Sequence, residues 1–259
     1  MKILPFIKMH GLGNDYVYID CFSKTTAEII SKTDLSALAQ RVSDRHFGIG
    51  SDGLVLILPA DQCDAGMRIF NADGSEAEMC GNAIRCVGKY LYESGRCPHT
   101  SMSIATRAGE RTLSLQATKG ILQEVTVNMG LPTIKPVTMK IGNNPVGYTS
   151  VSIGNPHAVF FRETIPQIPQ DMNVEFVRVR NNKELDVRVI ERGSGETLAC
   201  GTGACAAAVA AIFNGMTERN VTVHLPGGDL RVQWKSDLGP VFMTGSATEV
   251  FRGEYTWEK

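Results

Sequence analysis

The 259-residue chain lacks several features by which whole classes of protein are recognised. No run approaches the roughly 20 apolar residues that a membrane-spanning helix needs, and the first residues have neither the apolar core nor the cleavage site of a signal peptide. Lysine and arginine form no cluster of the kind that phosphate binding requires, and the formal net charge is -1. These absences predict a soluble protein with no nucleic-acid partner and no membrane partner.

Cysteine, in contrast, is abundant, with seven residues, yet no two of them have the Cys-x-x-Cys spacing of zinc-ribbon or thioredoxin sites. An odd number of cysteines without a secretion signal is typical of reduced thiols rather than of a disulfide framework. We therefore expect a cytoplasmic protein without a metal site, in which some thiols only pack and others react.

Two segments of the chain resemble each other when Cys80 is placed on Cys200. GSEAEMCGNA then aligns with SGETLACGTG, which also places Gly81 on Gly201. Each segment follows an expected strand and begins an expected helix, which should end near residue 93 in one case and near residue 213 in the other. The repeat predicts two similar lobes, each presenting a thiol at a helix N-terminus. A further segment, 25–47, has the spacing of an amphipathic helix.

Both of the helices that follow these cysteines are largely apolar, so we expect each to lie inside its lobe. A buried helix N-terminus leaves backbone N–H groups without partners and therefore favours an anionic ligand. The same position favours thiolate, which predicts that the pKa of Cys80 and of Cys200 is lowered towards neutrality. Such thiols suit general acid–base catalysis, whereas Cys86 and Cys205 fall within the helices and are expected to pack.

Motifs in the same order along nearly the whole chain resemble those of the diaminopimelate epimerase family. They are HGLGNDY (10–16), GIGSDG (48–53), FNADGSEAEMCGNAIRC (70–86), GNPHAV (154–159), NVEFV (173–177), ERGSGETLACGTGAC (191–205) and LPGGDL (225–230). The resemblance implies an α+β fold of two pseudo-symmetric lobes, each a mostly antiparallel β-sheet or barrel wrapped around a buried central helix. We expect one lobe at 1–128, completed by 245–259, and the other at 129–244.

The same resemblance implies an isomerase that converts LL-2,6-diaminopimelate into meso-2,6-diaminopimelate, for lysine and peptidoglycan synthesis, as a cytoplasmic homodimer. It implies no cofactor, neither pyridoxal phosphate nor a metal. Cys80 and Cys200 are then the proton donor and acceptor, and His157 and Glu191 tune the thiols. The residues implied to contact the substrate are Asn14, Asn71, Gly81, Asn82, Asn155, Asn173, Glu191, Arg192, Gly201 and Thr202.

The sequence departs from the usual pattern of that family in three places. Gly53 stands where some members have a substrate-contacting glutamine. Ala83 stands where a glycine is usual, and the segment at 162–172 is short. Two other interpretations also stay open. One is a related two-thiol isomerase of another amino acid, of the histidine or proline racemase type. The other is a metal-binding or redox module that uses four cysteines, although their spacings do not follow a zinc pattern.

Overall fold

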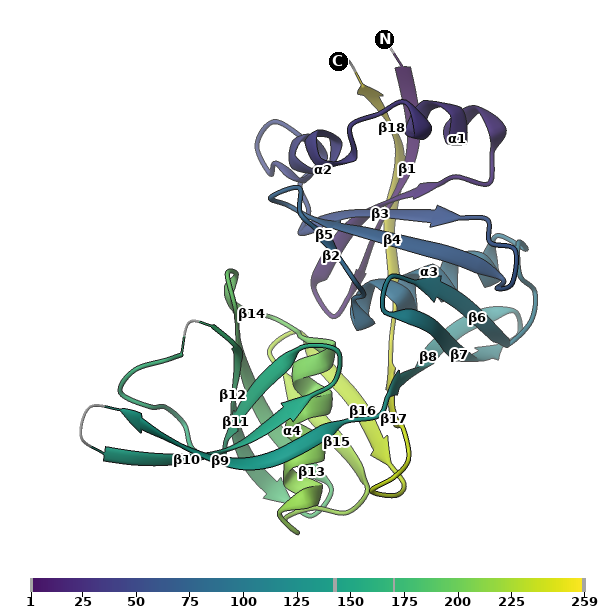
Figure 1. The fold of residues 1–259 in the computed structure, drawn as a ribbon. Helices are drawn as coiled ribbons and strands as arrows, with labels where there is room; N and C mark the ends of the chain where they lie inside the picture. Colours follow the sequence, from purple (N-terminus) through teal and green to yellow (C-terminus); the bar gives the residue numbers. More distant parts are fainter. Residues whose placement is uncertain (1, 142–143, 170, 258–259) are drawn as a thin grey trace. The chain divides into compact units, whose positions relative to one another are not determined.

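The computed structural model describes residues 2–141, 144–169 and 171–257 (Figure 1). The chain divides into two compact units. Unit 1 comprises Met1–Val127 with Ser246–Lys259, and unit 2 comprises Asn128–Gly245. No helix in the described ranges is both long and apolar enough to cross a membrane.

The described part of unit 1 is a β-sheet with three helices. Its helices are α1 (Lys24–Ser31), α2 (Leu35–Ser43) and α3 (Gly81–Glu93). Its strands are β1 (Lys2–Gly11), β2 (Asn14–Asp20), β3 (Gly53–Leu58), β4 (Ala65–Asn71), β5 (Glu76–Ala77), β6 (Ser101–Thr106), β7 (Gly109–Thr118), β8 (Ile121–Gly130, which ends in unit 2) and β18 (Thr248–Trp257). Helix α3 contacts β1, β2 and β7, and most of its side chains are buried.

The strands of unit 1 follow a definite order of pairing. β1 pairs antiparallel with β18 on one side and with β2 on the other, and β2 runs parallel to β3. β4 then pairs antiparallel with β3 and β5 and parallel with β6, and β6 continues antiparallel into β7 and β8. The sheet is therefore antiparallel except at two contacts, β2–β3 and β4–β6.

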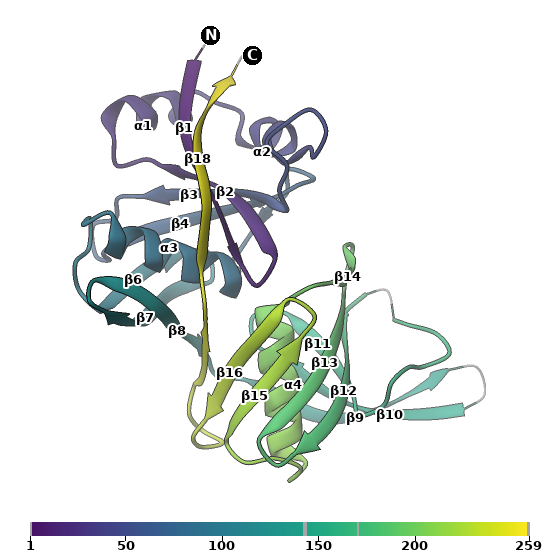
Figure 2. The same cartoon turned by 180° about the vertical axis from the view of Figure 1, so that it is seen from behind.

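The described residues of unit 2 include one helix, α4 (Gly201–Phe213), with strands on more than one side of it (Figures 1 and 2). The strands are β9 (Thr133–Ile141), β10 (Asn144–Ser152), β11 (Pro156–Phe160), β12 (Asn173–Asn181), β13 (Glu184–Glu191), β14 (Gly195–Thr197), β15 (Asn220–Leu225), β16 (Gly228–Trp234) and β17 (Val241–Gly245). Helix α4 contacts β10 to β13 and β15 to β17, and nearly all of its residues are buried. An apolar helix in such a position removes most of its surface from water, which is the main favourable term in folding.

Unit 2 repeats the pairing order of unit 1. β10 pairs antiparallel with β9 and β11, and β11 runs parallel to β12. β13 pairs antiparallel with β12 and β14 and parallel with β15, and β15 to β17 are antiparallel neighbours. In both units the buried helix follows a short strand: α3 follows β5 in unit 1, and α4 follows β14 in unit 2. The predicted α+β fold, with two similar lobes of mostly antiparallel sheet around a helix, is confirmed.

Candidate active site

Cys80 lies in an extended conformation at the N-cap of α3 in unit 1. Its Sγ donates to Oδ1 of Asn14 over 3.5 Å, and Nδ2 of Asn82 donates to the same oxygen over 3.3 Å. Gly81 and Asn82 form the first turn of the helix, and both are buried. Four of the residues implied by the family resemblance are thus neighbours in this unit.

A network of charged groups fixes the direction of the Asn14 amide. The carboxylate of Asp52 accepts from Nδ2 of Asn14 over 2.8 Å and from the backbone N–H of Asp15 over 3.1 Å. The guanidinium of Arg45 pairs with both Asp15 and Asp52, at 2.8 Å in each case. Because the amide nitrogen is held by a carboxylate, which only accepts, the amide oxygen is the atom that faces Cys80.

Asn71 lies at the end of β4, in an exposed position. Its Nδ2 donates to the hydroxyl of Ser75 over 2.9 Å, and its backbone N–H donates to the carbonyl oxygen of the same serine. Within the described part of unit 1, the structure thus gives Asn71 a place in the turn between β4 and β5. It does not join the hydrogen bonds around Cys80.

Cys200 occupies in unit 2 the position that Cys80 has in unit 1, at the N-cap of the buried helix. Its Sγ accepts from the backbone N–H of Gly203 over 3.4 Å and lies 3.4 Å from Oγ1 of Thr202. Gly201 and Thr202 form the first turn of α4. The predicted position of each thiol at the start of a buried helix is confirmed for both cysteines.

The predicted lowering of the Cys200 pKa is wrong for this structure. Burial raises the pKa of the Cys200 thiol well above its usual range, and the negative charges of Glu191 and Glu175 raise it further. The hydrogen bonds from Thr202 and from the Gly203 backbone act in the opposite direction and are outweighed. A helix N-terminus favours thiolate only modestly, whereas the removal of water and two nearby carboxylates both oppose a second negative charge.

The other predicted residues of unit 2 gather at one end of adjacent strands. Parallel pairing sets His157 of β11 beside Asn173 of β12, and β13, which is antiparallel to β12, ends at Glu191. Oδ1 of Asn173 accepts from the backbone N–H of Arg192 over 2.8 Å, while the Arg192 side chain is exposed. Oε1 of Glu191 accepts from the hydroxyl of Thr197 over 2.6 Å. Strand pairing thus brings together residues that are far apart in the sequence.

His157 is fully buried and its ring is held at both nitrogens. Nδ1 lies 2.6 Å from Oε1 of Glu175, and Nε2 lies 3.0 Å from Oδ1 of Asn155. Glu175 is also fully buried. Glu175 is not among the residues predicted from the sequence, although a signal for it exists. It follows Asn173 by two residues, so it shares a strand face with Asn173 inside an otherwise apolar run.

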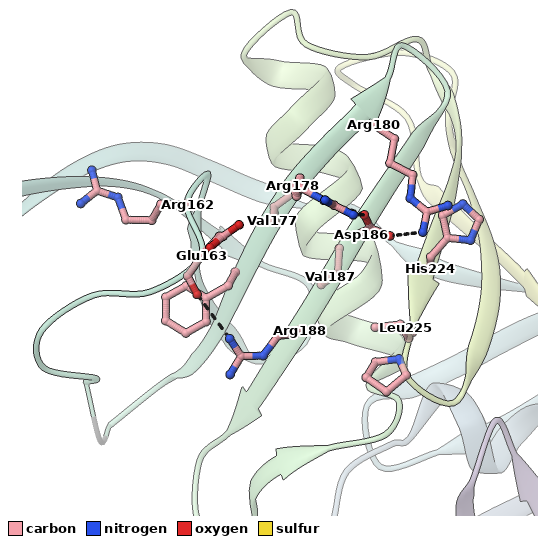
Figure 3. A pocket seen from close by; sticks show the side chains of 12 residues that line it. Arg162, Glu163, Val177, Arg178, Arg180, Asp186, Val187, Arg188, His224 and Leu225 are labelled. Atoms are coloured by element: carbon pink, nitrogen blue, oxygen red, sulfur yellow. Dashed lines mark hydrogen bonds and ion pairs between the residues drawn. The ribbon is translucent and has the colours of Figure 1, made fainter.

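A separate groove of about 510 Å³ lies on the outer face of unit 2, over β12 and β13 (Figure 3). Asp186 in this groove pairs with both Arg178 and Arg180, which lowers the pKa of its carboxyl to about 2. Arg188 is held by the carboxylate of Glu196 over 2.9 Å. These guanidinium groups are already paired with carboxylates at an exposed surface, where ion pairs are weak, and neither thiol lines the groove.

The cysteines of the described residues are free thiols. No group of three or more His, Cys, Asp or Glu side chains within these ranges is arranged to hold a metal ion. None of the seven cysteines forms a disulfide bond in the described structure. Cys80 and Cys200 thus each lie beside hydrogen-bonding groups at the start of a helix.

Comparison of the sequence with families of known proteins gives one consistent result. The model of a family described as "Diaminopimelate epimerase" matches residues 6–135 and 149–250. The chain is 46% identical over 280 residues to a diaminopimelate epimerase of Acetivibrio thermocellus, covering 97% of this chain and 98% of that protein. It is 45% identical over 280 residues to a diaminopimelate epimerase of Methanococcus maripaludis strain C5, covering 97% and 99%.

Comparison with solved structures shows the fold. A Bacillus anthracis phenazine biosynthesis protein of the PhzF family superimposes with a TM-score of 0.70, at 16% identity, over 99% of this chain and 100% of that chain. A hydroxyproline epimerase from Agrobacterium vitis, with bound trans-4-hydroxy-L-proline, superimposes with a TM-score of 0.69, at 15% identity, over 97% and 92%. At these identities the similarity concerns the fold alone.

Proposed function

Because this chain belongs to the diaminopimelate epimerase family, we propose that it interconverts LL- and meso-2,6-diaminopimelate with Cys80 and Cys200 as its acid and base. One thiolate removes the α-proton of the substrate, and the other thiol delivers a proton to the opposite face of the carbon. The observation that carries this proposal is the placement of each thiol at the start of a buried helix, in the same position of a repeated fold. No cofactor takes part in the proposed reaction.

The helix starts have a second task in this proposal, which is to stabilise the charge that develops when the α-proton leaves. The carboxylate beside that carbon takes up the charge, and each backbone donor that it meets is worth about 3 kcal/mol in comparable sites. The first turns of α3 and α4 begin with Gly81 and Gly201, which lack side chains and let an anion approach the backbone. Asn82 and Thr202 add side-chain donors at the same turns.

The two thiols need not be in the same protonation state before the substrate binds. The pKa of Cys200 is raised by burial and by Glu191, so this thiol keeps its proton at neutral pH. A protonated thiol suits the proton-donating half of the reaction. We propose that Cys200 starts as the acid of the pair in the substrate-free protein.

Recognition of the distal end of the substrate is assigned to Asn155, Asn173, Glu191 and Arg192 in unit 2. A guanidinium binds a carboxylate through two parallel hydrogen bonds, and the Arg192 side chain is exposed and able to do so. The carboxylate of Glu191 is an acceptor for the distal ammonium group. In unit 1 we assign Asn14 and Asn71 to the same substrate. We also propose that the enzyme acts as a homodimer in the cytoplasm.

The test uses the purified protein with LL-diaminopimelate and, in separate reactions, L-proline and L-histidine. Chiral chromatography follows the second isomer. Formation of meso-diaminopimelate, without racemisation of the single-ended amino acids, is expected, and dialysis against EDTA should leave the rate unchanged. Racemisation of proline or histidine, with diaminopimelate left unaltered, would instead establish the alternative of a two-thiol racemase of another amino acid.

A further inference from the structure

The strand position that faces the first turn of α4 in unit 2 holds a carboxylate that the proposed reaction has not yet used. Glu175 of β12 is fully buried, and Oε1 lies 2.6 Å from Nδ1 of the equally buried His157. Oε2 has no hydrogen-bond partner in the described residues. Burial of an ionised carboxylate oxygen without a hydrogen-bond partner raises the free energy of the folded state. The presence of Glu175 at this position therefore needs a physical reason.

The hydrogen bonds of His157 define where its protons are. Oδ1 of Asn155 lies 3.0 Å from Nε2, and because an amide oxygen only accepts, this contact is a hydrogen bond when Nε2 carries a proton. The 2.6 Å contact on the other side requires a second proton between Nδ1 and Oε1 of Glu175, because two bare acceptors repel. His157 and Glu175 together therefore carry one proton more than a neutral imidazole beside an ionised carboxylate would carry.

The surroundings of Glu175 favour this extra proton. Burial raises the pKa of the Glu175 carboxyl, the neighbouring His157 lowers it, and the negative charge of Glu191 on β13 raises it again. The helix on the other side presents Cys200, whose own ionisation Glu175 opposes. Gly203 in that helix leaves so little room that an added Cβ would lie 2.9 Å from Oε1. Burial and Glu191 thus oppose a negative charge on this carboxyl, and His157 of β11 is the neighbour that favours it.

We propose that Glu175 is a positioning residue that keeps a proton on Nε2 of His157 and thereby directs the amide nitrogen of Asn155 away from the ring, towards an anionic group of the substrate. The half-buried Asn155 side chain then offers a donor, as a carboxylate requires. A bare Nε2 would reverse the amide and present its oxygen, which would repel that carboxylate. This inference rests on the proposed function, since it assigns Asn155 to substrate recognition.

A direct test observes the ring in the unaltered protein. Histidines labelled with ¹⁵N are observed by NMR at neutral pH, and the His157 signals are identified by their loss in a His157→Asn variant. Nε2 of His157 is expected to carry a proton. A bare Nε2, with the proton on Nδ1, would overturn the proposal without any measurement of activity.

A second test compares Glu175→Gln with Asp229→Asn as the matched control. The carboxylate of Asp229 also lies beside a histidine Nδ1, since its Oδ1 is 2.8 Å from Nδ1 of His224. In contrast to Glu175, Asp229 is exposed. A neutral amide at residue 175 can either donate to Nδ1 or accept from it, so both directions of the Asn155 amide become populated. We expect kcat/KM for diaminopimelate to fall about tenfold or more in Glu175→Gln, the effect of one misdirected hydrogen bond to a charged group, and to stay unchanged in Asp229→Asn.

The division of the loss between KM and kcat separates positioning from a merely structural role. Because the Asn155 amide is assigned to substrate recognition, Glu175→Gln should raise KM more than it lowers kcat. A loss confined to kcat, or no deficit, would contradict the proposal. Absence of epimerisation in the unaltered protein would instead refute the proposed function, while the NMR result would still stand.

Discussion

The amide of Asn14 and the carboxylate of Asp52 are joined by a hydrogen bond of 2.8 Å, and this bond decides which atom of Asn14 meets the Cys80 thiol. The thiol donates to Oδ1 because Nδ2 is already held. In unit 2, Glu175 acts on His157 and Asn155 in a comparable way. Each unit therefore has a buried or half-buried carboxylate that orients an asparagine through hydrogen bonds.

Substitution of Asp52 tests the orienting role in unit 1. In Asp52→Asn the amide of Asn14 loses its charged acceptor, and we expect kcat/KM to fall about tenfold, corresponding to about 1.5 kcal/mol for a hydrogen bond to a charged group. Steady-state kinetics with LL-diaminopimelate measures this. Asp34→Asn is the control, because Asp34 caps α2 through its side chain and asparagine caps a helix equally well. Equal activity of the two variants would exclude the role assigned to Asp52.

Substitution of Glu191 tests the origin of the raised Cys200 pKa. Burial is the largest cause, and the negative charge of Glu191 is the next, so Glu191→Gln should lower that pKa without restoring it to the ordinary value. The thiolate fraction at a fixed pH then rises, and alkylation of Cys200 by iodoacetamide, followed by peptide mass spectrometry, should become faster. Epimerisation should become slower, since Glu191 is also assigned to the substrate.

The control for this experiment is Glu184→Gln, at the opposite end of the same strand, where the carboxylate accepts from Asn181. Its Cys200 alkylation rate should equal that of the unaltered protein. An unchanged or slower alkylation of Cys200 in Glu191→Gln would show that the carboxylate does not oppose ionisation of the thiol.

Because the Cys86 thiol is buried, we expect the free energy of unfolding to fall at alkaline pH. Burial raises the pKa of Cys86 to about 11, whereas a thiol in the unfolded chain ionises near pH 8.5. The protonated Cys86 thiol therefore makes its full contribution to the free energy of unfolding below about pH 8.5. This contribution, up to about 3 kcal/mol, is lost as the pH rises towards 11. Urea unfolding at a series of pH values should show a smaller alkaline decline in Cys86→Ala than in the unaltered protein. Equal declines would contradict the assignment.

A methyl group at Gly203 has no room beside Glu175. The added Cβ would lie 2.9 Å from Oε1 of Glu175 and 3.3 Å from Cβ of Cys200. Because overpacking of a tight core costs about 1–3 kcal/mol, we expect Gly203→Ala to lower the free energy of unfolding by that amount and to slow epimerisation. Gly147→Ala, at an exposed position of β10 with no atom within 4 Å of the added Cβ, should leave both unchanged. Denaturant unfolding and kinetics compare the two.

Local sequence signals predict the two buried helices well. The Cys-Gly pairs mark the starts of α3 and α4, and the expected ends near residues 93 and 213 agree with Glu93 and Phe213. Segment 25–47 is a different case, since it forms two helices, α1 and α2, rather than one. Asp34 caps the second helix by accepting from Ala37, a signal that the amphipathic spacing alone does not reveal.

The features that the sequence does not reveal depend on partners from distant strands. Glu175 is a functional candidate only because parallel pairing of β11 and β12 sets His157 next to it. The raised pKa of Cys200 likewise depends on burial and on Glu191 from another strand. The helix start was readable from the sequence, but the local dielectric and the charges opposite it follow from tertiary structure.

The most direct test of the central claim is the rate of LL-diaminopimelate epimerisation by Cys80→Ser and Cys200→Ser, with Cys63→Ser as the control. Removal of one acid–base group should reduce kcat by a factor on the order of 10² to 10⁴, in each of the first two variants, while circular dichroism shows an unchanged fold. Cys63, which is half-buried and lies outside both helix starts, should be replaceable without loss. Near-normal turnover by a folded Cys80→Ser or Cys200→Ser protein would contradict the two-thiol mechanism.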